Sequence, residues 1–390
     1  MFRRLGQTKG IKRHNFDRKG ICFVKKIVAV LLCVLFIGCC FFGCGKSEAS
    51  SLKVEGTYPR DYEGTVLNVY NWGQYMSDGS EGSLNVNEEF EKLTGIQVNY
   101  AEYESNESLY TKLKSGGAAY DIIIPSDYMV ARLIKEDLLQ KFDPTVLSNY
   151  KYILDDFKNI YFDPNNEYSV PYQYCCVGLI YNTTMVEGTP DSWSIMWDQK
   201  YSGNILNFNN SRDGFGVAQY YLQQDINTAD KADWDAAFEK LKEQKPLIQS
   251  YVMDEVFNKM EGGNAAIAPY YSGDFLTMQE VNPDLAFVYP KEGSNISVDS
   301  VCIPACAGNV EAAKLYINFL MEPEVALANA ETICYASPNS AVISNPNYSL
   351  KDNEVIYPPQ DVLKKMQFFQ NLDQETLAYI NNLWNQLKIS

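Results

Sequence analysis

Aromatic, hydroxyl and amide side chains stand directly after several β-rich runs of this 390-residue chain. The set comprises Trp72, Gln74, Tyr75, Ser126, Tyr128, Asn210, Asp213, Tyr270 and Tyr271, and Asp299 adds a carboxylate near another predicted strand edge. Basic groups are few among them, whereas an anion site uses Arg, Lys or Gly- and Ser-rich helix starts. Ring faces combined with a few carboxylates suit an alkyl ammonium ion. These residue types therefore favour a site for a small organic cation.

Histidine-dependent chemistry is excluded from most of the chain. His14 is the single histidine, so residues 45–390 can form no Ser-His-Asp triad, Cys–His dyad or His-ligated zinc site. The cysteines in that range are Cys175, Cys176, Cys302, Cys306 and Cys334, an odd number without regular spacing. Such a set is a poor disulfide framework and lacks the further ligands of a metal site. We expect small buried apolar residues, no metal and no cofactor.

The net charge of −16 is unevenly distributed along the chain. Residues 1–44 hold nine Lys and Arg residues and one acid, Asp17, which leaves 24 basic and 48 acidic residues and a charge of −24 for the remainder. A body with that field repels nucleic acids and anionic lipid headgroups, so we expect no nucleic-acid partner.

The N-terminus has the pattern of a secretion signal. Basic Met1–Lys26 precedes the apolar run Ile27–Phe42, which is short for a membrane span and suits a signal-peptide core. The segment around Cys44 resembles a bacterial lipoprotein signal, with Cys39 as a second candidate for acylation and an uncleaved anchor as the alternative. Each interpretation tethers residues 45–390 at the extracytoplasmic face of the cell membrane. Residues 1–44 are then the signal peptide and residues 45–64 a linker.

The elements that must position the polar set alternate between strands and helices. Strands are predicted at Thr65–Tyr70, Ile96–Tyr100, Tyr120–Ile124, Asn204–Phe208, Ala265–Ala268 and Leu285–Tyr289, and helices at Val86–Leu93, Ser105–Leu113, Ala229–Gln244 and Val310–Met321. This alternation is typical of an α/β fold with βαβ units and a mostly parallel sheet. The length indicates two lobes. Ligands of such sheets bind beyond the carboxyl ends of the strands, where the polar set begins.

Five segments resemble the spermidine/putrescine-binding proteins of polyamine ABC importers. They are VYNWGQY (69–75), YESNESLYTKLKSGGAAYDIIIPSDYMV (103–130), FDPNNEYSVPY (162–172), YPKEGSNISVDSVCIP (289–304) and ETICYASPN (331–339). The resemblance implies a two-lobed type II periplasmic-binding-protein fold, with two crossover segments and a hinged ligand cleft. Residues 65–175 plus 297–340 would form lobe 1, and residues 176–296 plus 341–390 lobe 2.

The resemblance also implies ligand-binding roles for individual residues. Trp72 and Tyr75 match the family's first aromatic pair, Ser126 and Tyr128 its P-S-x-Y element, Asp213 a glutamate of its second lobe, Asp299 the aspartate that holds one ammonium end, Tyr335 the aromatic of E-T-I-x-Y, and Gln370 a C-terminal glutamine. The chain departs from one branch of the family at four positions. That branch has aspartate at the position of Asn210, an acid at the position of Gln74, and tryptophans at the positions of Tyr270 and Ser297. A site with fewer carboxylates and indoles would suit a smaller or less charged amine as well as it suits spermidine.

The function implied by this resemblance is binding without catalysis. A monomeric, lipid-tethered receptor would capture putrescine or spermidine and deliver it to a membrane permease and its ATPase. One alternative keeps the fold but binds another small cationic solute or a metal chelate, as the residues at Asn210 and Ser297 allow. The other is an extracytoplasmic hydrolase that uses Asp213 and Asp299 as paired carboxylates, although neither acid has an evident reason in the sequence for a raised pKa.

Overall fold

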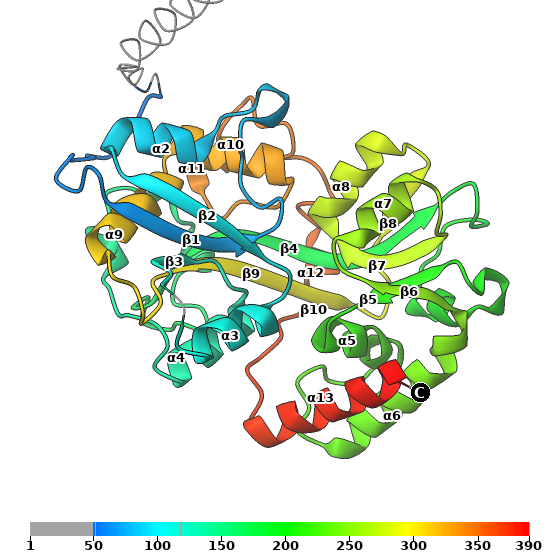
Figure 1. Ribbon diagram of the computed structural model, residues 1–390. Coiled ribbons are helices and arrows are strands. Elements are labelled where there is room, and N and C mark those ends of the chain that lie inside the picture. The colour runs from blue at the N-terminus through cyan, green and yellow to red at the C-terminus, as the bar shows by residue number, and fades with distance from the viewer. Residues whose placement is uncertain (1–49, 51, 118, 390) are drawn as a thin grey trace, which may run out of the picture. The chain divides into compact units, whose positions relative to one another are not determined.

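The strands of the computed structural model follow one path, β2-β1-β3-β9-β4-β7-β5-β6, with β10 beside β9 and β8 beside β4 (Figure 1). Residues 50–389 are described, except 51 and 118. The expected signal peptide, with Cys39 and Cys44, lies outside these residues. Within them, no helix is both long and apolar enough to cross a membrane. Their mixture of strands and helices confirms the predicted α/β class.

Three strands form the first strand group. β1 (Val66–Trp72) pairs in parallel with β2 (Gln97–Tyr103) on one side and with β3 (Ile122–Ile123) on the other. The helices that alternate with them are α2 (Val86–Thr94), α3 (Asn106–Lys114) and α4 (Asp127–Lys135). The side chains of Asn85 and Ser105 accept hydrogen bonds from the first turns of α2 and α3, which is why these helices begin there. The register places Trp72 beside Tyr103 at the carboxyl ends of β1 and β2.

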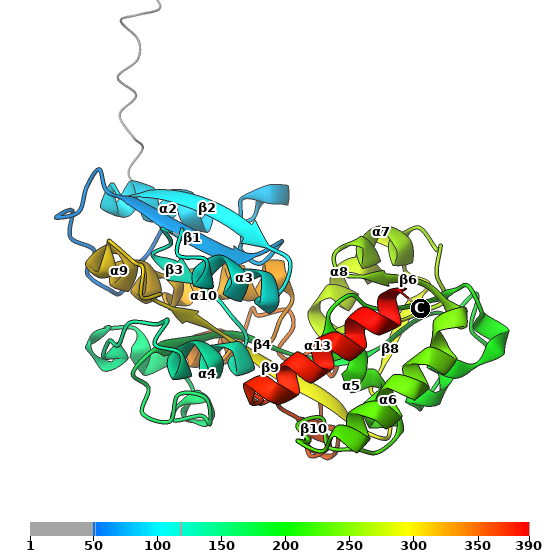
Figure 2. The same ribbon diagram turned by 60° about the horizontal axis from the view of Figure 1, so that its bottom comes forward.

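The second strand group repeats this arrangement. β5 (Ile205–Phe208) lies between β6 (Ile248–Val252) and β7 (Ile267–Tyr271) and is parallel to both. Its helices are α5 (Ser211–Tyr221), α6 (Lys231–Gln244), α7 (Glu255–Glu261), α8 (Ser272–Val281) and the C-terminal α13 (Gln374–Ile389). α13 packs along α6 (Figure 2). The carboxyl ends of β5 and β7 lead directly into α5 and α8, so the first turns of both helices stand at the same sheet edge.

Two long strands run between these groups. The first half of β4 (Ser169–Asn182) pairs with β9 (Ser294–Cys302), and its second half pairs with β7 and with β8 (Leu285–Val288), always antiparallel. The expectation of a mostly parallel sheet therefore holds within each group and is wrong where β4 and β9 join them. β4 was not predicted because Pro171 interrupts its pattern, and the pairing register shifts beside that residue.

The segment after β9 returns to the first group and then to the second. It forms α9 (Val310–Leu320), α10 (Pro323–Ile333), α11 (Ser340–Ile343), α12 (Gln360–Leu363) and β10 (Met366–Gln367). α11 packs on α10, where Val342 and Tyr348 share a small core with Ala330. β10 then pairs with β9, so a third stretch of chain accompanies the two long strands.

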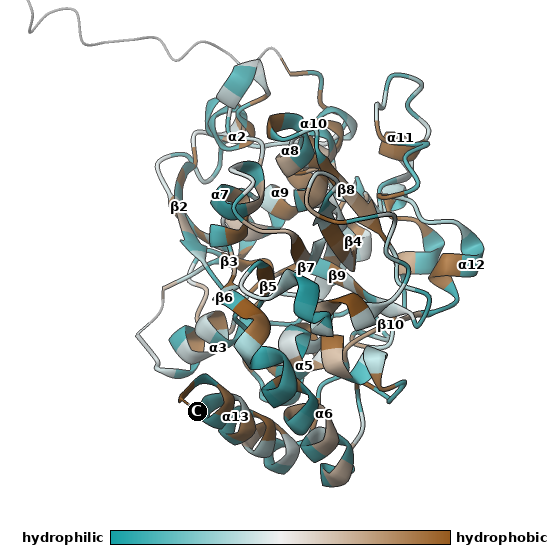
Figure 3. Cartoon of the chain, turned by 90° about the vertical axis from the view of Figure 1, so that its right-hand side faces the viewer, coloured by the Kyte–Doolittle hydropathy of each residue, from teal (hydrophilic) through white to brown (hydrophobic). Residues whose placement is uncertain are grey.

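Each strand group has its own hydrophobic core. Leu67, Phe90 and Tyr316 belong to the first core, and Trp193 and Phe208 to the second. Figure 3 shows hydrophobic residues along β4 and β7, with more hydrophilic residues on the outer helices. All five cysteines from residue 50 onward are free thiols, and four are buried as expected. Cys306 is exposed, because it lies in a turn after β9, and the expectation of burial is wrong there.

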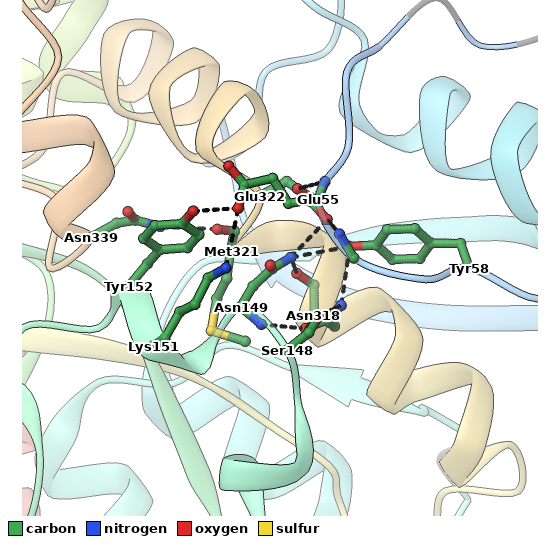
Figure 4. Close-up of polar contacts among 11 residues, drawn as sticks. Glu55, Tyr58, Ser148, Asn149, Lys151, Tyr152, Asn318, Met321, Glu322 and Asn339 are labelled. Carbon is green, nitrogen blue, oxygen red and sulfur yellow. Dashed lines mark hydrogen bonds and ion pairs between the residues drawn. The ribbon is translucent and has the colours of Figure 1, made fainter.

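The start of the described chain is fixed to the first strand group. Glu322 is fully buried and accepts hydrogen bonds from the backbone N–H groups of Glu55 (2.8 Å) and Gly56 (2.7 Å), the Tyr58 hydroxyl (2.6 Å) and the Asn149 amide (2.7 Å), as Figure 4 shows in part. Apolar Leu52, Val54, Tyr58 and Tyr62 pack on the first core. The expected linker over residues 45–64 is therefore packed from Leu52 onward, because these side chains bury apolar surface.

Candidate ligand-binding site

A cavity of about 880 Å³ is lined by both strand groups and by the strands between them. Ten of the eleven predicted site residues line it: Trp72, Gln74, Tyr75, Ser126, Tyr128, Asn210, Asp213, Tyr270, Asp299 and Tyr335. The described residues that line the cavity include several Asp and Glu residues and no Lys, Arg or His. Its lining is therefore negatively charged without a compensating cation, which favours a positively charged guest.

Asp299 is the most deeply buried carboxylate of the cavity. It lies in the middle of β9, opposite Gln173 of β4, and is 5% exposed. The Tyr75 hydroxyl donates a hydrogen bond to its Oδ2 at 2.6 Å, whereas Oδ1 has no partner among the described residues. Burial raises the pKa of Asp299 to about 6, and the neighbouring Ser126 and Tyr75 hydroxyls limit that rise. Oδ1 is thus a buried acceptor whose hydrogen-bonding capacity is unused among the described residues.

Asp213 forms the second carboxylate, in the first turn of α5. Asn210 is the N-cap residue: its Oδ1 accepts from the Asp213 backbone N–H at 2.9 Å, and its Nδ2 donates to Asp213 Oδ2 at 2.8 Å. The Tyr271 hydroxyl donates to the same oxygen at 3.0 Å. Burial raises the pKa of Asp213 to about 6, opposed by the hydrogen bonds from Asn210 and Tyr271. Asn210 therefore orients Asp213. At the position of Asn210 itself, one branch of the family has an aspartate.

Asp274, in the first turn of α8, is the third carboxylate. The Tyr335 hydroxyl donates to its Oδ2 at 3.3 Å. Burial raises the pKa of Asp274 to about 8, and the charges of Asp254 and Asp299 add to the effect. Tyr335 lies so close to Gly273 that a Cβ there would be 2.0 Å from the tyrosine ring. Gly273 thus allows the ring to pack against the start of α8 and to reach Asp274.

Each of these three carboxylates has a tyrosine partner. The Tyr75 and Tyr335 rings are in edge-to-face contact, with centroids 5.1 Å apart, so the Asp299 and Asp274 pairs are neighbours. Burial, followed by the charges of Asp299, Asp274 and Asp213, raises the pKa of the Cys175 thiol in β4. All three carboxylates line the cavity, and the charges of all three act on the same β4 side chain.

Aromatic rings of the first strand group line the same cavity. The Trp72 indole N–H donates to the Ile124 carbonyl at 2.9 Å, and its ring lies 4.6 Å from that of Tyr103. The Tyr128 hydroxyl accepts from Asn106 at 3.1 Å and donates to Glu107 at 3.0 Å. These hydrogen bonds satisfy the polar edges of the rings, whose faces are chemically suited to cations.

Gln370 is the one predicted site residue that does not line the cavity. Its backbone N–H donates to Asn227 at 2.7 Å, its carbonyl accepts from Arg212 at 3.0 Å, and its side chain is exposed. The neighbouring Phe369 lines the cavity instead. The Arg212 guanidinium is buried 4.6 Å from the Phe369 ring and is not a lining residue. The backbone contacts of this segment therefore present Phe369, and not Gln370, to the cavity.

Tyr271 and Asp274 are absent from the residues that the resemblance assigns to the site. Both Tyr270 and Tyr271 belong to the polar set of the sequence, but the resemblance names only Tyr270, whose ring stacks on Phe208 in the second core and is 2% exposed. Consecutive strand residues point to opposite faces, so only one tyrosine of the pair can present its hydroxyl to Asp213. The run PYYSGD contains both Tyr271 and Asp274. It continues from the strand end into the next helix, so its position could have indicated these two residues as site candidates.

Comparisons with known proteins agree with this geometry. The sequence profile of bacterial extracellular solute-binding proteins matches residues 85–355. The spermidine/putrescine-binding periplasmic protein of Salmonella typhimurium is 34% identical over 316 residues, which cover 80% of this chain and 89% of that protein. A Listeria monocytogenes protein assigned to a spermidine/putrescine ABC transporter has a structure 35% identical, with a TM-score of 0.79 over 83% of this chain and 99% of that one.

A second solved structure gives the same result. The substrate-binding protein of a spermidine/putrescine ABC transporter from Streptococcus pneumoniae, in complex with calcium and HEPES, is 34% identical, with a TM-score of 0.71 over 83% of this chain and 99% of that one. The likeness confirms the predicted type II periplasmic-binding-protein fold. The matching family consists of proteins that bind solutes for transporters, and it is not a family of enzymes. This chain therefore belongs to the bacterial extracellular solute-binding protein family.

Proposed function

We propose that this chain is the substrate receptor of an ABC importer and captures polyamines of the putrescine and spermidine class. The observation that carries the proposal is the cavity with three tyrosine–carboxylate pairs and no basic lining residue among those described. The relatives named for spermidine and putrescine support the same ligand class. The chain performs no chemistry in this proposal and passes its ligand to a permease and its ATPase.

The energetics of such a site are sufficient for tight binding. At an effective dielectric constant of 20, an ammonium about 4 Å from a carboxylate gains ~4 kcal/mol before desolvation costs. Each cation–π contact adds ~0.5–2 kcal/mol, and micromolar affinity needs about −8 kcal/mol. Two carboxylates and one or two rings therefore reach that range only in a closed, water-poor cleft.

Closure of the cleft is part of the proposal. In this proposal, residues 65–175 plus 297–357 form lobe 1, and residues 176–296 plus 358–390 form lobe 2. Residues 341–357 were expected in lobe 2, but Val342 and Tyr348 pack with α10 of lobe 1. β4 and β9 connect the lobes and would act as the hinge. The two separate hydrophobic cores support movement of the lobes as rigid bodies.

The proposed location is the extracytoplasmic face of the cell membrane, through lipid on Cys44. A monomer is proposed, since one chain supplies all three carboxylates of the cavity. The contacts of Glu322 with residues 55–58 imply that the tether leads directly into lobe 1. Mass spectrometry of the membrane-extracted chain, with Cys44→Ala and Cys39→Ala as matched variants, tests this attachment: loss of lipid only in Cys39→Ala would contradict it.

Titration calorimetry of the detergent-extracted full-length chain tests the ligand class. Putrescine and spermidine should both give heat, whereas 1,4-butanediol, which has the carbon chain of putrescine without charge, should give none. The expectation follows from the need of the buried carboxylates for positive partners. Absence of heat and of a thermal shift with both amines at millimolar concentration would refute the polyamine assignment.

A second candidate is the same receptor with another small cationic solute. Asn210 and Ser297 favour it, since a neutral amide and a hydroxyl line the cavity at two positions where one branch of the family has an acid and an indole. A thermal-shift panel of amines, cationic amino acids and metal chelates would separate the two candidates. A ligand at 100 times its dissociation constant should stabilise the protein by ~2.7 kcal/mol.

A further inference from the structure

The segment Phe368–Gln370 directly follows β10 and contacts both lobes beside the ligand cavity. We propose that Tyr161 of lobe 1 and this segment of lobe 2 form a latch that holds the cleft closed and slows the release of bound ligand. The inference rests on the proposed function and on the closure proposed with it. It assigns a role to Tyr161, which lies outside the five segments that carry the resemblance.

The segment is fixed to lobe 2 through its backbone. β10 pairs with the start of β9 immediately before it. The Arg212 guanidinium, which is 2% exposed, donates to the Gln370 carbonyl at 3.0 Å. The Asn227 side chain accepts from the Gln370 N–H at 2.7 Å and donates to the Phe368 carbonyl at 2.8 Å. The segment should therefore move with lobe 2 when the lobes separate.

Tyr161 is fixed to lobe 1 by its neighbours in the chain. Phe162 is 4% exposed and shares a hydrophobic cluster with Met129 and Leu133 of α4, against which Ile160 also packs. The Tyr161 and Phe162 rings are in edge-to-face contact, with centroids 5.4 Å apart. The position of Tyr161 is thus set by lobe 1.

The two lobes meet where Tyr161 reaches the segment. The Tyr161 hydroxyl donates to the Phe369 carbonyl at 2.5 Å, and the centroids of the Tyr161 and Phe368 rings are 5.6 Å apart. These two side chains are 43% and 37% exposed, respectively. A contact that separates when the cleft opens has to lie at the surface of both lobes, and this exposure fits that requirement.

The latch shares one residue with the ligand cavity. The Phe369 ring lines the cavity, with its centroid 6.1 Å from that of the Tyr128 ring of lobe 1, while the Phe369 carbonyl accepts from Tyr161. Tyr161 and Phe368 are not among the described residues that line the cavity. The latch therefore acts on the closed state and not on the ligand, and it should stabilise closure equally for every ligand.

Dissociation rates of the full-length chain in detergent test the latch. Tyr161→Phe removes the hydroxyl and keeps the ring. We expect the dissociation rates of putrescine and spermidine to rise by the same factor, roughly 3- to 10-fold, at unchanged association rate constants in stopped-flow tryptophan fluorescence. The matched control is Tyr379→Phe, which removes the hydrogen bond of a tyrosine hydroxyl to Asp235 within lobe 2 and should change neither rate.

A covalent bridge tests the same contact without any amine. Cys306 is an exposed thiol, so the bridge is made in a Cys306→Ser background. A short bis-maleimide should join residues 161 and 368 in the ligand-free Tyr161→Cys, Phe368→Cys variant, as detected by mass spectrometry of proteolytic peptides. The bridged chain, loaded with amine before bridging, should release it more slowly than the unbridged chain, because its lobes cannot separate.

Three outcomes would overturn the inference. Unchanged dissociation rates in Tyr161→Phe would leave Tyr161 without a role in closure, and unequal factors for the two amines would place it at the ligand. Failure to bridge residues 161 and 368, both with and without amine, would show that the contact does not form. A wild-type chain that binds neither amine would instead refute the proposed function, and the bridge in the ligand-free chain would still decide whether the latch exists.

Discussion

Replacing Asp299 by asparagine should move stability and affinity in opposite directions. The introduced amide would keep the shape of the side chain and could still accept the hydrogen bond from Tyr75, but it would lack the negative charge. A residue with a purely structural role loses stability when it is replaced, so the two effects distinguish a binding carboxylate from a structural one.

The stability change follows from the pKa of Asp299. The pKa of this carboxyl is about 6 in the folded protein, against an ordinary value of 3.8, so ionisation at pH 8 costs the ligand-free protein about 3 kcal/mol. Because the folded pKa is raised, this contribution is favourable at low pH and is lost as the pH rises through 6. Asp299→Asn should therefore raise the free energy of unfolding by up to about 3 kcal/mol at pH 8 and change it little at pH 4.

The affinity change follows from the lost ion pair. Removing one partner of a buried charge pair costs ~2–4 kcal/mol, which raises the dissociation constant for spermidine or putrescine roughly 30- to 1000-fold. Urea denaturation without ligand and titration calorimetry with both amines measure the two quantities. Asp284→Asn is a matched control, since it removes an exposed charge outside the cavity and should change neither. A variant that loses stability at pH 8 while keeping its affinity would refute the reasoning.

Three further predictions follow from the site and from the packing around it. Amine affinity should fall as the pH is lowered from 8 to 5, because the raised pKa values of Asp213, Asp274 and Asp299 let protons compete with the ligand. Calorimetry in buffers of different ionisation enthalpy at pH 7 should detect proton release on binding. An affinity that does not depend on pH would contradict this prediction. Trp72→Ala should weaken amine binding roughly 3- to 30-fold. Trp384→Ala, in the core between α13 and α5, should reduce the free energy of unfolding by ~3–5 kcal/mol and leave the affinity unchanged. The reverse pattern would mean that the cleft is misplaced. Glu322→Gln should reduce the free energy of unfolding by about 2–3 kcal/mol in urea titration without changing affinity, since an amide cannot accept all four hydrogen bonds of the buried carboxylate; an unchanged unfolding midpoint would contradict the role of this cluster.

Local features of the sequence predicted most of the regular elements. The helices expected at Val86–Leu93 and Ser105–Leu113 and the strand-forming runs before Trp72 and Ser126 depend on residues close together in the chain, and the structure places these elements within a few residues of the expectation. The rule that ligands bind beyond strand ends, together with the family resemblance that added Tyr335, then brought ten predicted residues to one cavity. The length of the chain added two lobes as an expectation, and the aromatic and carboxylate residue types added a cationic ligand.

Long-range contacts decided what these local features could not. Pro171 and Gly178 weaken the strand signal of β4, which forms because β9, β7 and β8 pair with it from distant parts of the sequence. Leu52 to Tyr62 lack regular structure and look like a tether, yet the buried Glu322, far along the chain, binds them.

The sequence by itself determined the class of the fold, the sign of the charge around the cleft and the residue types at the strand ends, because each depends on composition or on near neighbours. Only the tertiary structure decided that Tyr271 and not Tyr270 reaches Asp213, that Phe369 replaces Gln370 at the cavity, and that Asp274 joins the other carboxylates. These choices depend on which side of a strand or loop faces the cavity. Packing against elements distant in sequence sets that orientation, and no local pattern encodes it.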